Sequence, residues 1–221
     1  MNTKLNKQII VIALLMATCG IGRSQSFVNL RFESPVLPLV PDGGFQVPIA
    51  NALPGWTGYI GGSQVSSVAY NAVSIGAPSI SLQGTGSTFP PIQGNYSVLF
   101  QPYFSTVAIG QVGQIPSNAN SLQFYSGSGS LQASFAGQAI PLVQLGSTSN
   151  YLIFGGDVSA WAGTSGELRF TLPSIQFSYA NPFLDNIFFS TQSIPEPSTY
   201  SLLGCGVLLL GAARAAFKRK P

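Results

Sequence analysis

Short apolar runs, none of them with helical periodicity, fill the chain between residues 26 and 193. Each run is five to eight residues long and is bounded by Gly, Pro, Ser or Asn, which end strands and form turns. Strands of this length and spacing are typical of a sandwich or barrel. The sequence therefore predicts an all-β domain. The predicted strands are 27–32, 55–60, 66–70, 79–83, 96–101, 106–112, 121–125, 131–135, 138–143, 151–157, 166–172, 175–179 and 183–190.

Two details of this pattern make finer predictions. Polar and apolar residues alternate over 168–172, so Arg169 and Thr171 should face outward while their neighbours face the core. The Ser-Gly repeat over 126–130 is typical of a flexible tip and predicts a hairpin that joins the strands 121–125 and 131–135.

Charge is scarce, and this excludes several classes of function. Only 7% of residues are charged, against about 25% in ordinary domains. Residues 26–194 hold two arginines against five carboxylates, a net charge of −3, and therefore have no basic footprint for nucleic acid. The absence of histidine removes a Ser-His-Asp triad and any His metal ligand, and two cysteines cannot form a Cys-only zinc site.

The N-terminus has the features of a signal peptide. Lys4 and Lys7 precede an apolar run over 9–17, which is too short to span a bilayer and is followed by small residues. We therefore expect residues 1–25 to direct export through the general secretion machinery. Cys19 allows a lipoprotein alternative, although the residue before it is Thr18 and not a small Gly, Ala or Ser.

The C-terminus has the features of a single membrane anchor. Residues 198–213 carry no charge, and a basic tail follows that would remain in the cytoplasm by the positive-inside rule. The tail consists of Arg214, Lys218, Arg219 and Lys220. The preceding chain is therefore expected on the outer side of the inner membrane.

Residues 194–221 as a whole resemble the bacterial PEP-CTERM sorting signal. Pro195, Glu196 and Pro197, the Ser-Thr-Tyr and Leu-Leu-Gly that follow, the apolar segment and the basic tail occur in the order of that family. The resemblance implies that an exosortase, a membrane protease, cuts near the Pro-Glu-Pro motif in a Gram-negative-type bacterium that makes exopolysaccharide. A plain anchor that is never cut is the alternative. Both cysteines lie in the segments expected to be removed.

The domain over 26–193 is similar, in the order of its motifs, to the galactose-binding-like jelly roll. The motifs are Phe32-Glu33 near the start, Pro54-Gly55-Trp56, and Leu184-Asp185 near the end. Arg31 and Asn186 depart from the family pattern, which has Asn and Asp there. The resemblance implies a single jelly-roll β-sandwich and makes Glu33 and Asp185 the expected ligands of a structural calcium ion. The alternative is that these two carboxylates cap turns at strand ends.

Aromatic side chains in Gly- and Pro-rich segments suggest a carbohydrate site. Trp56, Tyr59, Tyr103 and Trp161 are the residues expected to stack on sugar rings, with Asn, Gln and Ser supplying hydrogen bonds. The alternative for Trp56 and Trp161 is burial in or beside the core, because tryptophan is highly buried on average.

The sequence thus predicts an exported protein without catalytic activity, sorted to the cell surface or the exopolysaccharide matrix, that binds polysaccharide or contributes to that matrix. Two alternatives stay open. A structural or adhesive protein would expose apolar patches to protein partners. A polysaccharide hydrolase would need two converging carboxylates, for which Asp157 and Glu167 are close in sequence.

Overall fold

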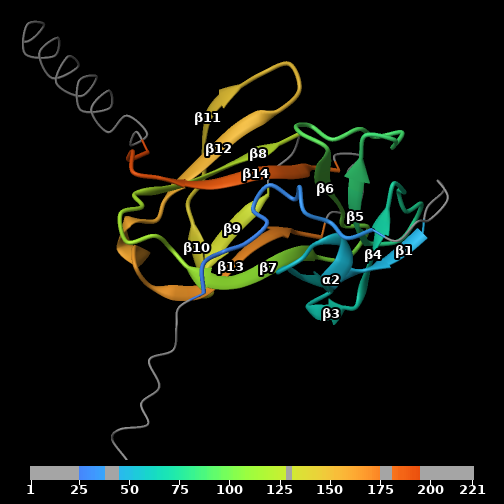
Figure 1. The fold of residues 1–221 in the computed structure, drawn as a ribbon, viewed down its shortest axis with the longest axis horizontal. Helices are drawn as coiled ribbons and strands as arrows, with labels where there is room; N and C mark the ends of the chain where they lie inside the picture. The colour runs from blue at the N-terminus through green and yellow to red at the C-terminus, as the bar shows by residue number, and fades with distance from the viewer. Residues whose placement is uncertain (1–24, 38–44, 128–130, 175–180, 195–221) are drawn as a thin grey trace, which may run out of the picture.

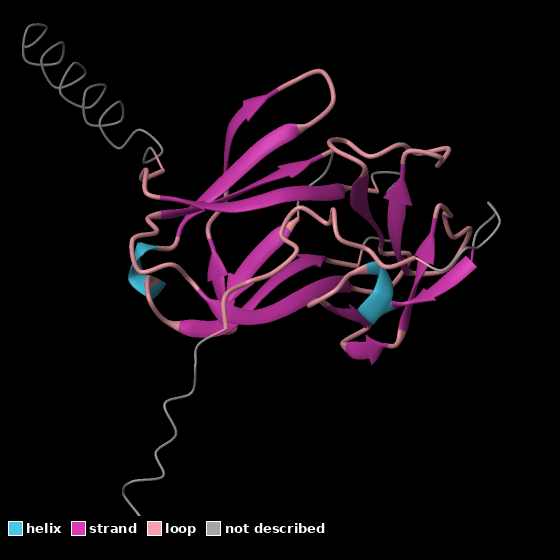
Figure 2. Ribbon diagram, viewed as in Figure 1, coloured by secondary structure: helices cyan, strands magenta, loops and turns pink. Residues whose placement is uncertain are grey.

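The computed structural model describes residues 25–37, 45–127, 131–174 and 181–194. All but one residue of the predicted signal peptide, and all but one of the predicted sorting segment, lie outside these ranges. Within them, two β-sheets face each other as a sandwich, and helix is confined to single turns (Figures 1 and 2). The predicted all-β class is confirmed.

The described strands form one sheet of eight strands and one of six. The larger sheet has the order β1 (Phe45–Pro48), β4 (Ser67–Tyr70), β5 (Ser79–Gly84), β6 (Tyr96–Gln101), β14 (Phe183–Ser190), β8 (Ser121–Ser126), β12 (Leu152–Asp157) and β11 (Val143–Ser147). The smaller sheet has the order β10 (Gln138–Ile140), β9 (Gln132–Phe135), β13 (Ser165–Leu172), β7 (Val107–Gln114), β2 (Thr57–Ile60) and β3 (Ser63–Val65).

A column of aromatic rings connects the two sheets through the core. Phe170 on β13 of the smaller sheet meets Phe124 on β8 of the larger one edge to face, with ring centroids 5.0 Å apart. Phe170 also contacts Trp56, and Trp56 contacts Phe32 at 5.6 Å. Edge-to-face and tilted pairs of this kind stabilise a core beyond the area that they bury.

The segment that carries Phe32 closes the open side between the sheets, and it is not the strand that the sequence predicts over 27–32. Asn29 and Phe32 have positive φ angles of 50° and 57°, which lie outside the backbone conformation of a regular strand. The buried side-chain amide of Gln111 on β7 replaces a strand partner, because it accepts from the Val28 N–H at 2.6 Å and donates to the Val28 carbonyl at 3.0 Å. Trp56 Nε1 donates to the carbonyl of Asn29 at 3.2 Å.

Strands β4 and β5 are parallel, although residues 71–78 alone connect them. Parallel neighbours normally need a connection of a dozen residues or more, usually with a helix. Here buried polar side chains stabilise the tight return. Ser81 Oγ and Gln83 Nε2 both donate to the carbonyl of Ala72, at 2.7 and 2.8 Å, and the side chain of Gln101 binds both the N–H and the carbonyl of Ser74.

Two further predictions about pairing are wrong. The strands 121–125 and 131–135 do not form a hairpin, because β8 belongs to the larger sheet and β9 to the smaller one. The predicted strand 138–143 divides at Pro141 into β10 and β11, which also lie in different sheets. Strands β1 and β3 were not predicted, and the predicted strand 175–179 lies outside the described residues. The remaining predicted strands are present with ends within two residues.

Removing the ring of Phe32 should destabilise the sandwich strongly. Phe32 is fully buried, whereas Phe89 is 46% exposed and makes a matched control. We expect Phe32→Ala to lower the free energy of unfolding by about 3–5 kcal/mol and Phe89→Ala by less than about 1 kcal/mol. Denaturant unfolding of both variants measures this, and equal losses would contradict the placement of Phe32 in the core.

Candidate functional site

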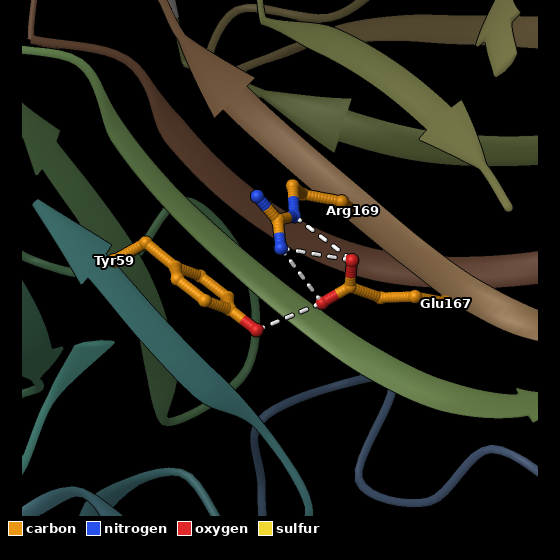
Figure 3. A network of polar contacts seen from close by, with 3 residues as sticks. All are labelled: Tyr59, Glu167 and Arg169. Carbon is orange, nitrogen blue, oxygen red and sulfur yellow. Dashed lines mark hydrogen bonds and ion pairs between the residues drawn. The ribbon is translucent and has the colours of Figure 1, made fainter. Parts of the chain in front are cut away.

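A cluster of three polar side chains lies on the outer face of the smaller sheet (Figure 3). Alternation along β13 turns Leu168 and Phe170 into the core, so Glu167 and Arg169 face outward. The outward position of Arg169 was predicted. Tyr59 comes from β2, and β7 runs between β2 and β13.

The three side chains form one hydrogen-bonded unit. Arg169 donates from Nε to Glu167 Oε2 at 3.0 Å and from Nη2 to Oε1 at 3.1 Å. The Tyr59 hydroxyl donates to Glu167 Oε1 at 2.9 Å, and the guanidinium carbon lies 4.0 Å from the centre of the Tyr59 ring. The bonds to Glu167 raise the pKa of Arg169 above its ordinary value, although partial burial opposes this. About 30% of each charged side chain remains exposed.

A glycine makes this arrangement possible. Gly110 of β7 pairs with Arg169 on one side and with Thr57 on the other, beneath the cluster. A Cβ atom at Gly110 would lie 2.4 Å from Glu167 Oε1, so any other residue would push the carboxylate away. Because Gly110 has no side chain, the side chains of β2 and β13 can contact each other across the backbone of β7.

Neutral hydrogen-bonding groups flank the cluster on β3 and β9, whereas on β7 the exposed Val112 lies beside Glu167. Cross-strand partners point to the same face of a sheet, which places Gln64 beside Tyr59, Ser134 beside Arg169 and Gln132 beside Thr171. A hollow of about 380 Å³ lies at the β9 and β10 end of this face, lined in part by Gln132, Ser134 and Thr171. We call this surface, from Tyr59 to Gln132, the polar face.

The polar face is suited to an uncharged ligand rich in hydroxyl groups. Its one arginine and one carboxylate neutralise each other, and each keeps hydrogen-bonding capacity beyond the pair. Amide and hydroxyl side chains extend the surface along the sheet, and the ring of Tyr59 supplies apolar area.

The structure places the four predicted sugar-stacking residues in different environments. Trp56 is 3% exposed between Phe32 and Phe170, so it cannot stack on a sugar and its prediction as a site residue is corrected. Trp161 is half-buried at the end of a 3₁₀ turn and packs against Phe135. Tyr103 is exposed in the loop after β6. Tyr59 alone of the four belongs to the polar face.

Glu167 and Arg169 were not predicted as carbohydrate-site residues. Glu167 was considered only as a hydrolase carboxylate with Asp157, but Asp157 lies on the other sheet and accepts from the N–H of Ser159. One signal was available in the sequence. In a domain with two arginines, an outward arginine two residues from a glutamate predicts a local ion pair on the same strand face.

The two predicted calcium ligands converge on the residues around 93–97. Glu33 accepts from the Asn95 N–H at 2.7 Å, from Asn95 Nδ2 at 3.0 Å and from the Tyr96 N–H at 3.3 Å. Gly94 has a positive φ of 63°, and a Cβ there would lie 2.1 Å from Glu33 Oε1. Asp185 is 1% exposed and accepts from Ser97 Oγ and from the Asn186 N–H, both at 2.6 Å.

Burial raises the pKa of Asp185, and the nearby charge of Glu33 raises it further. Hydrogen bonds from Ser97, Asn186 and Gln93 partly offset this rise and leave the pKa at about 7. The two negative charges of Glu33 and Asp185 would balance the charge of a divalent cation. Every oxygen of both carboxylates, however, already accepts a hydrogen bond from the protein. No group of three or more acidic or cysteine side chains that could hold a metal occurs among the described residues. The hydrogen bonds support turn capping, and calcium stays a prediction.

The sorting motif Pro195, Glu196 and Pro197 and the basic tail Arg214, Lys218, Arg219 and Lys220 lie outside the described residues. Over the part of the chain that the structure describes, no helix has the length and apolar character needed to cross a membrane.

Comparisons with known proteins do not identify a family for this chain. No family model matches the chain, and no curated protein matches it. Among solved structures, one similar chain is the Stig cyclase Fisc from Fischerella sp. TAU, solved in complex with (3Z)-3-(1-methyl-2-pyrrolidinylidene)-3H-indole. The two are 14% identical, with a TM-score of 0.39, over 74% of this chain and 94% of the cyclase. A likeness of this extent says nothing about the function of this chain.

Stability should fall as the pH rises through the range in which Asp185 titrates. The folded protein keeps this proton up to about pH 7, whereas the unfolded chain releases it near 3.8. The stabilisation is therefore complete below about pH 4, falls progressively as the pH rises, and is lost once the pH has risen through about 7, with a total loss on the order of 4 kcal/mol. Denaturant unfolding in chelator should show this fall, and Asp185→Asn should remove it because an amide does not titrate. An equal fall in both proteins would contradict the prediction.

The same measurement in excess calcium chloride tests the calcium prediction. A bound Ca²⁺ would favour the ionised carboxylate and reduce the fall between about pH 4 and pH 7. Asp185→Asn would abolish that response. Identical curves in calcium and in chelator would leave turn capping as the role of both carboxylates.

Proposed function

We propose that this chain is an exported, non-catalytic protein that an exosortase sorts to the cell surface or exopolysaccharide matrix, and that its sandwich binds polysaccharide through the polar face. The observation that carries the binding proposal is the unit of Tyr59, Glu167 and Arg169. It combines the aromatic ring of Tyr59, the N–H donors of the Arg169 guanidinium and the two acceptor oxygens of the Glu167 carboxylate on the outer face of the sheet.

Recognition would use the two kinds of surface that a sugar ring presents. Neighbouring hydroxyls can accept from Arg169 and donate to Glu167, because the two groups lie side by side and about a third exposed. The apolar side of the ring would lie against Tyr59. The unit is organised before any ligand arrives, so little side-chain entropy is lost on binding.

The polar face can hold more than one sugar unit of a polymer. Thr171 pairs with Gln132 and Arg169 with Ser134, so hydrogen-bonding groups continue from the cluster to the hollow beside β10. Many weak contacts along one chain add affinity through effective concentration. A matrix protein needs contacts of this kind more than one tight site.

Export and sorting rest on the residues at both ends of the chain. Lys4, Lys7 and the apolar run over 9–17 support a signal peptide, and the Pro-Glu-Pro motif, apolar segment and basic tail support an exosortase signal. Strand β14 ends at Ser190, and the described chain ends at Ile194, directly before the Pro-Glu-Pro motif (Figure 1).

We also propose the galactose-binding-like jelly roll as the finer class of the sandwich. Two largely antiparallel sheets, with the segment of Phe32 and Glu33 at one seam and Leu184 and Asp185 on a central strand, support it. The opening segment differs from the predicted strand, as described above.

Binding to neutral polysaccharides tests the polar face. The full chain in detergent is run by affinity electrophoresis against purified polymers, including the exopolymer of the host. We expect Tyr59→Ala and Arg169→Met to weaken binding by about tenfold or more, since each removes a contact worth about 1.4 kcal/mol. The matched control is Tyr125→Ala, a tyrosine on the outer face of the larger sheet. Unchanged binding by Tyr59→Ala, or its loss in Tyr125→Ala, would overturn the assignment of this face.

Sorting is tested in a cell that contains an exosortase. We expect the exported chain to be shortened near Pro195-Glu196-Pro197 and to leave the inner membrane, and we expect Glu196→Ala to keep it there at full length. Gln192→Ala, four residues earlier and exposed, is the control and should be processed normally. Immunoblots of membrane and surface fractions measure this. Normal processing of Glu196→Ala would refute the role of the motif.

A further inference from the structure

Two uncharged loops lie side by side at one end of the sandwich. Residues 71–78 lead into β5, and residues 102–106 follow β6. The first residue of β5, Ser79, pairs with the last residue of β6, Gln101, so the loops leave the larger sheet at the same end. Neither loop contains Asp, Glu, Lys or Arg. The ring of Tyr103 lies beside Gly76, about 3.9 Å from the position of a Cβ there.

These loops expose apolar side chains, which together we call the loop tip: Val73, Ile75, Tyr103 and Phe104. Ile75 is 97% exposed, so it protrudes from the molecule and does not line a groove. Tyr103 and Phe104 are each about half exposed and meet edge to face at 4.7 Å. Other large apolar side chains are also exposed in the described domain, namely Val28, Val36, Phe89 and Val112, but by 42–68% and not by 97%. The loop tip differs from them in that a nearly fully exposed isoleucine lies on the same end of the sheet as two half-exposed rings.

The backbone beneath the loop tip is hydrogen-bonded from inside the protein. The carbonyl of Ala72 accepts from Ser81 and Gln83, and the N–H and carbonyl of Ser74 both bind Gln101. In the second loop, the Ser105 N–H donates to the carbonyl of Pro102 at 2.6 Å. These groups are satisfied within the protein, so bringing this end of the sandwich to an apolar surface does not cost their hydrogen bonds to water. The side chains, and not the loop backbone, would enter the lipid interface.

The size and charge of the loop tip identify its occupant. At their exposed fractions, the four side chains offer roughly 400 Å² of surface, about half of what one partner contributes to a stable protein interface. A lipid surface needs no complementary patch and accepts a few apolar side chains, with tyrosine at the level of the headgroups. The absence of basic residues from both loops favours zwitterionic over anionic lipid.

We propose that the loop tip inserts into the interface of a zwitterionic phospholipid bilayer, with Ile75 deepest. This inference is independent of sugar binding, since the polar face lies on the other sheet. It also concerns a different end of the molecule from Ser190, the last residue of β14. Strand β14 pairs with β6 at Phe183 and reaches Ser190 seven residues later, about 25 Å away from the loop end.

A fluorescent probe at position 75 tests this in the full chain. With Cys19→Ser and Cys205→Ser as background, Ile75→Cys carries an environment-sensitive label, and vesicles of phosphatidylcholine are added. We expect the emission to shift to the blue and to be quenched by lipids that carry a nitroxide near the headgroup. The matched control is Ser149→Cys in the exposed β11–β12 loop, which should show neither effect. Tyr103→Ser together with Phe104→Ser should reduce the shift at position 75.

Three results would overturn the proposal. The first is an emission at position 75 that vesicles leave unchanged. The second is an equal shift at position 149, which would mean that the whole chain adsorbs or aggregates. The third is a blue shift that grows with protein concentration in the absence of vesicles, which would mean that a second copy covers the loop tip. Polysaccharide binding measured on the same labelled protein separates each of these from failure of the polar face.

Discussion

The ring contacts between Phe32, Trp56, Phe170 and Phe124 hold this sandwich together. They connect the opening segment, the entry to β2 and one strand of each sheet in a single buried column. The opening segment has irregular backbone and joins no sheet beyond one isolated bridge at Ser26. Its place between the sheets therefore depends on the burial of Phe32 and on the few hydrogen bonds around it.

In this domain, which has few charges, neutral side-chain amides hold irregular segments in place. In other proteins ion pairs or strand pairing often serve this purpose. The Gln111 side chain pairs with the backbone of Val28, and the Gln101 side chain pairs with the backbone of Ser74. Both amides are buried and have donor and acceptor satisfied, which is the condition for a buried polar group to stabilise a fold. They fix two segments that no regular hydrogen-bond pattern would hold.

The charges that the described domain does contain are concentrated, and this shapes its surface. Glu167 and Arg169 neutralise each other on the polar face, and Glu33 and Asp185 hold the residues around 93–97. Apart from the exposed Arg31 and Asp157, the rest of the described surface offers hydroxyls, amides and apolar loops. Such a surface suits the uncharged partners that we propose, a polysaccharide on one sheet and a lipid interface at one end.

The sequence by itself determined the all-β class, most strand positions and the outward direction of Arg169, because these depend on local alternation and on Gly and Pro breaks. It also carried the features of both termini. It did not determine which strands pair. The Ser-Gly repeat after β8 suggests a hairpin, yet the chain crosses there to the other sheet, since pairing follows from which faces bury together. Only the tertiary structure buried Trp56, which the sequence predicts as a sugar-stacking residue, brought Tyr59 to Glu167 across β7 and placed the ring of Tyr103 beside Gly76. Those contacts join residues up to about a hundred positions apart, and no local pattern encodes such distances.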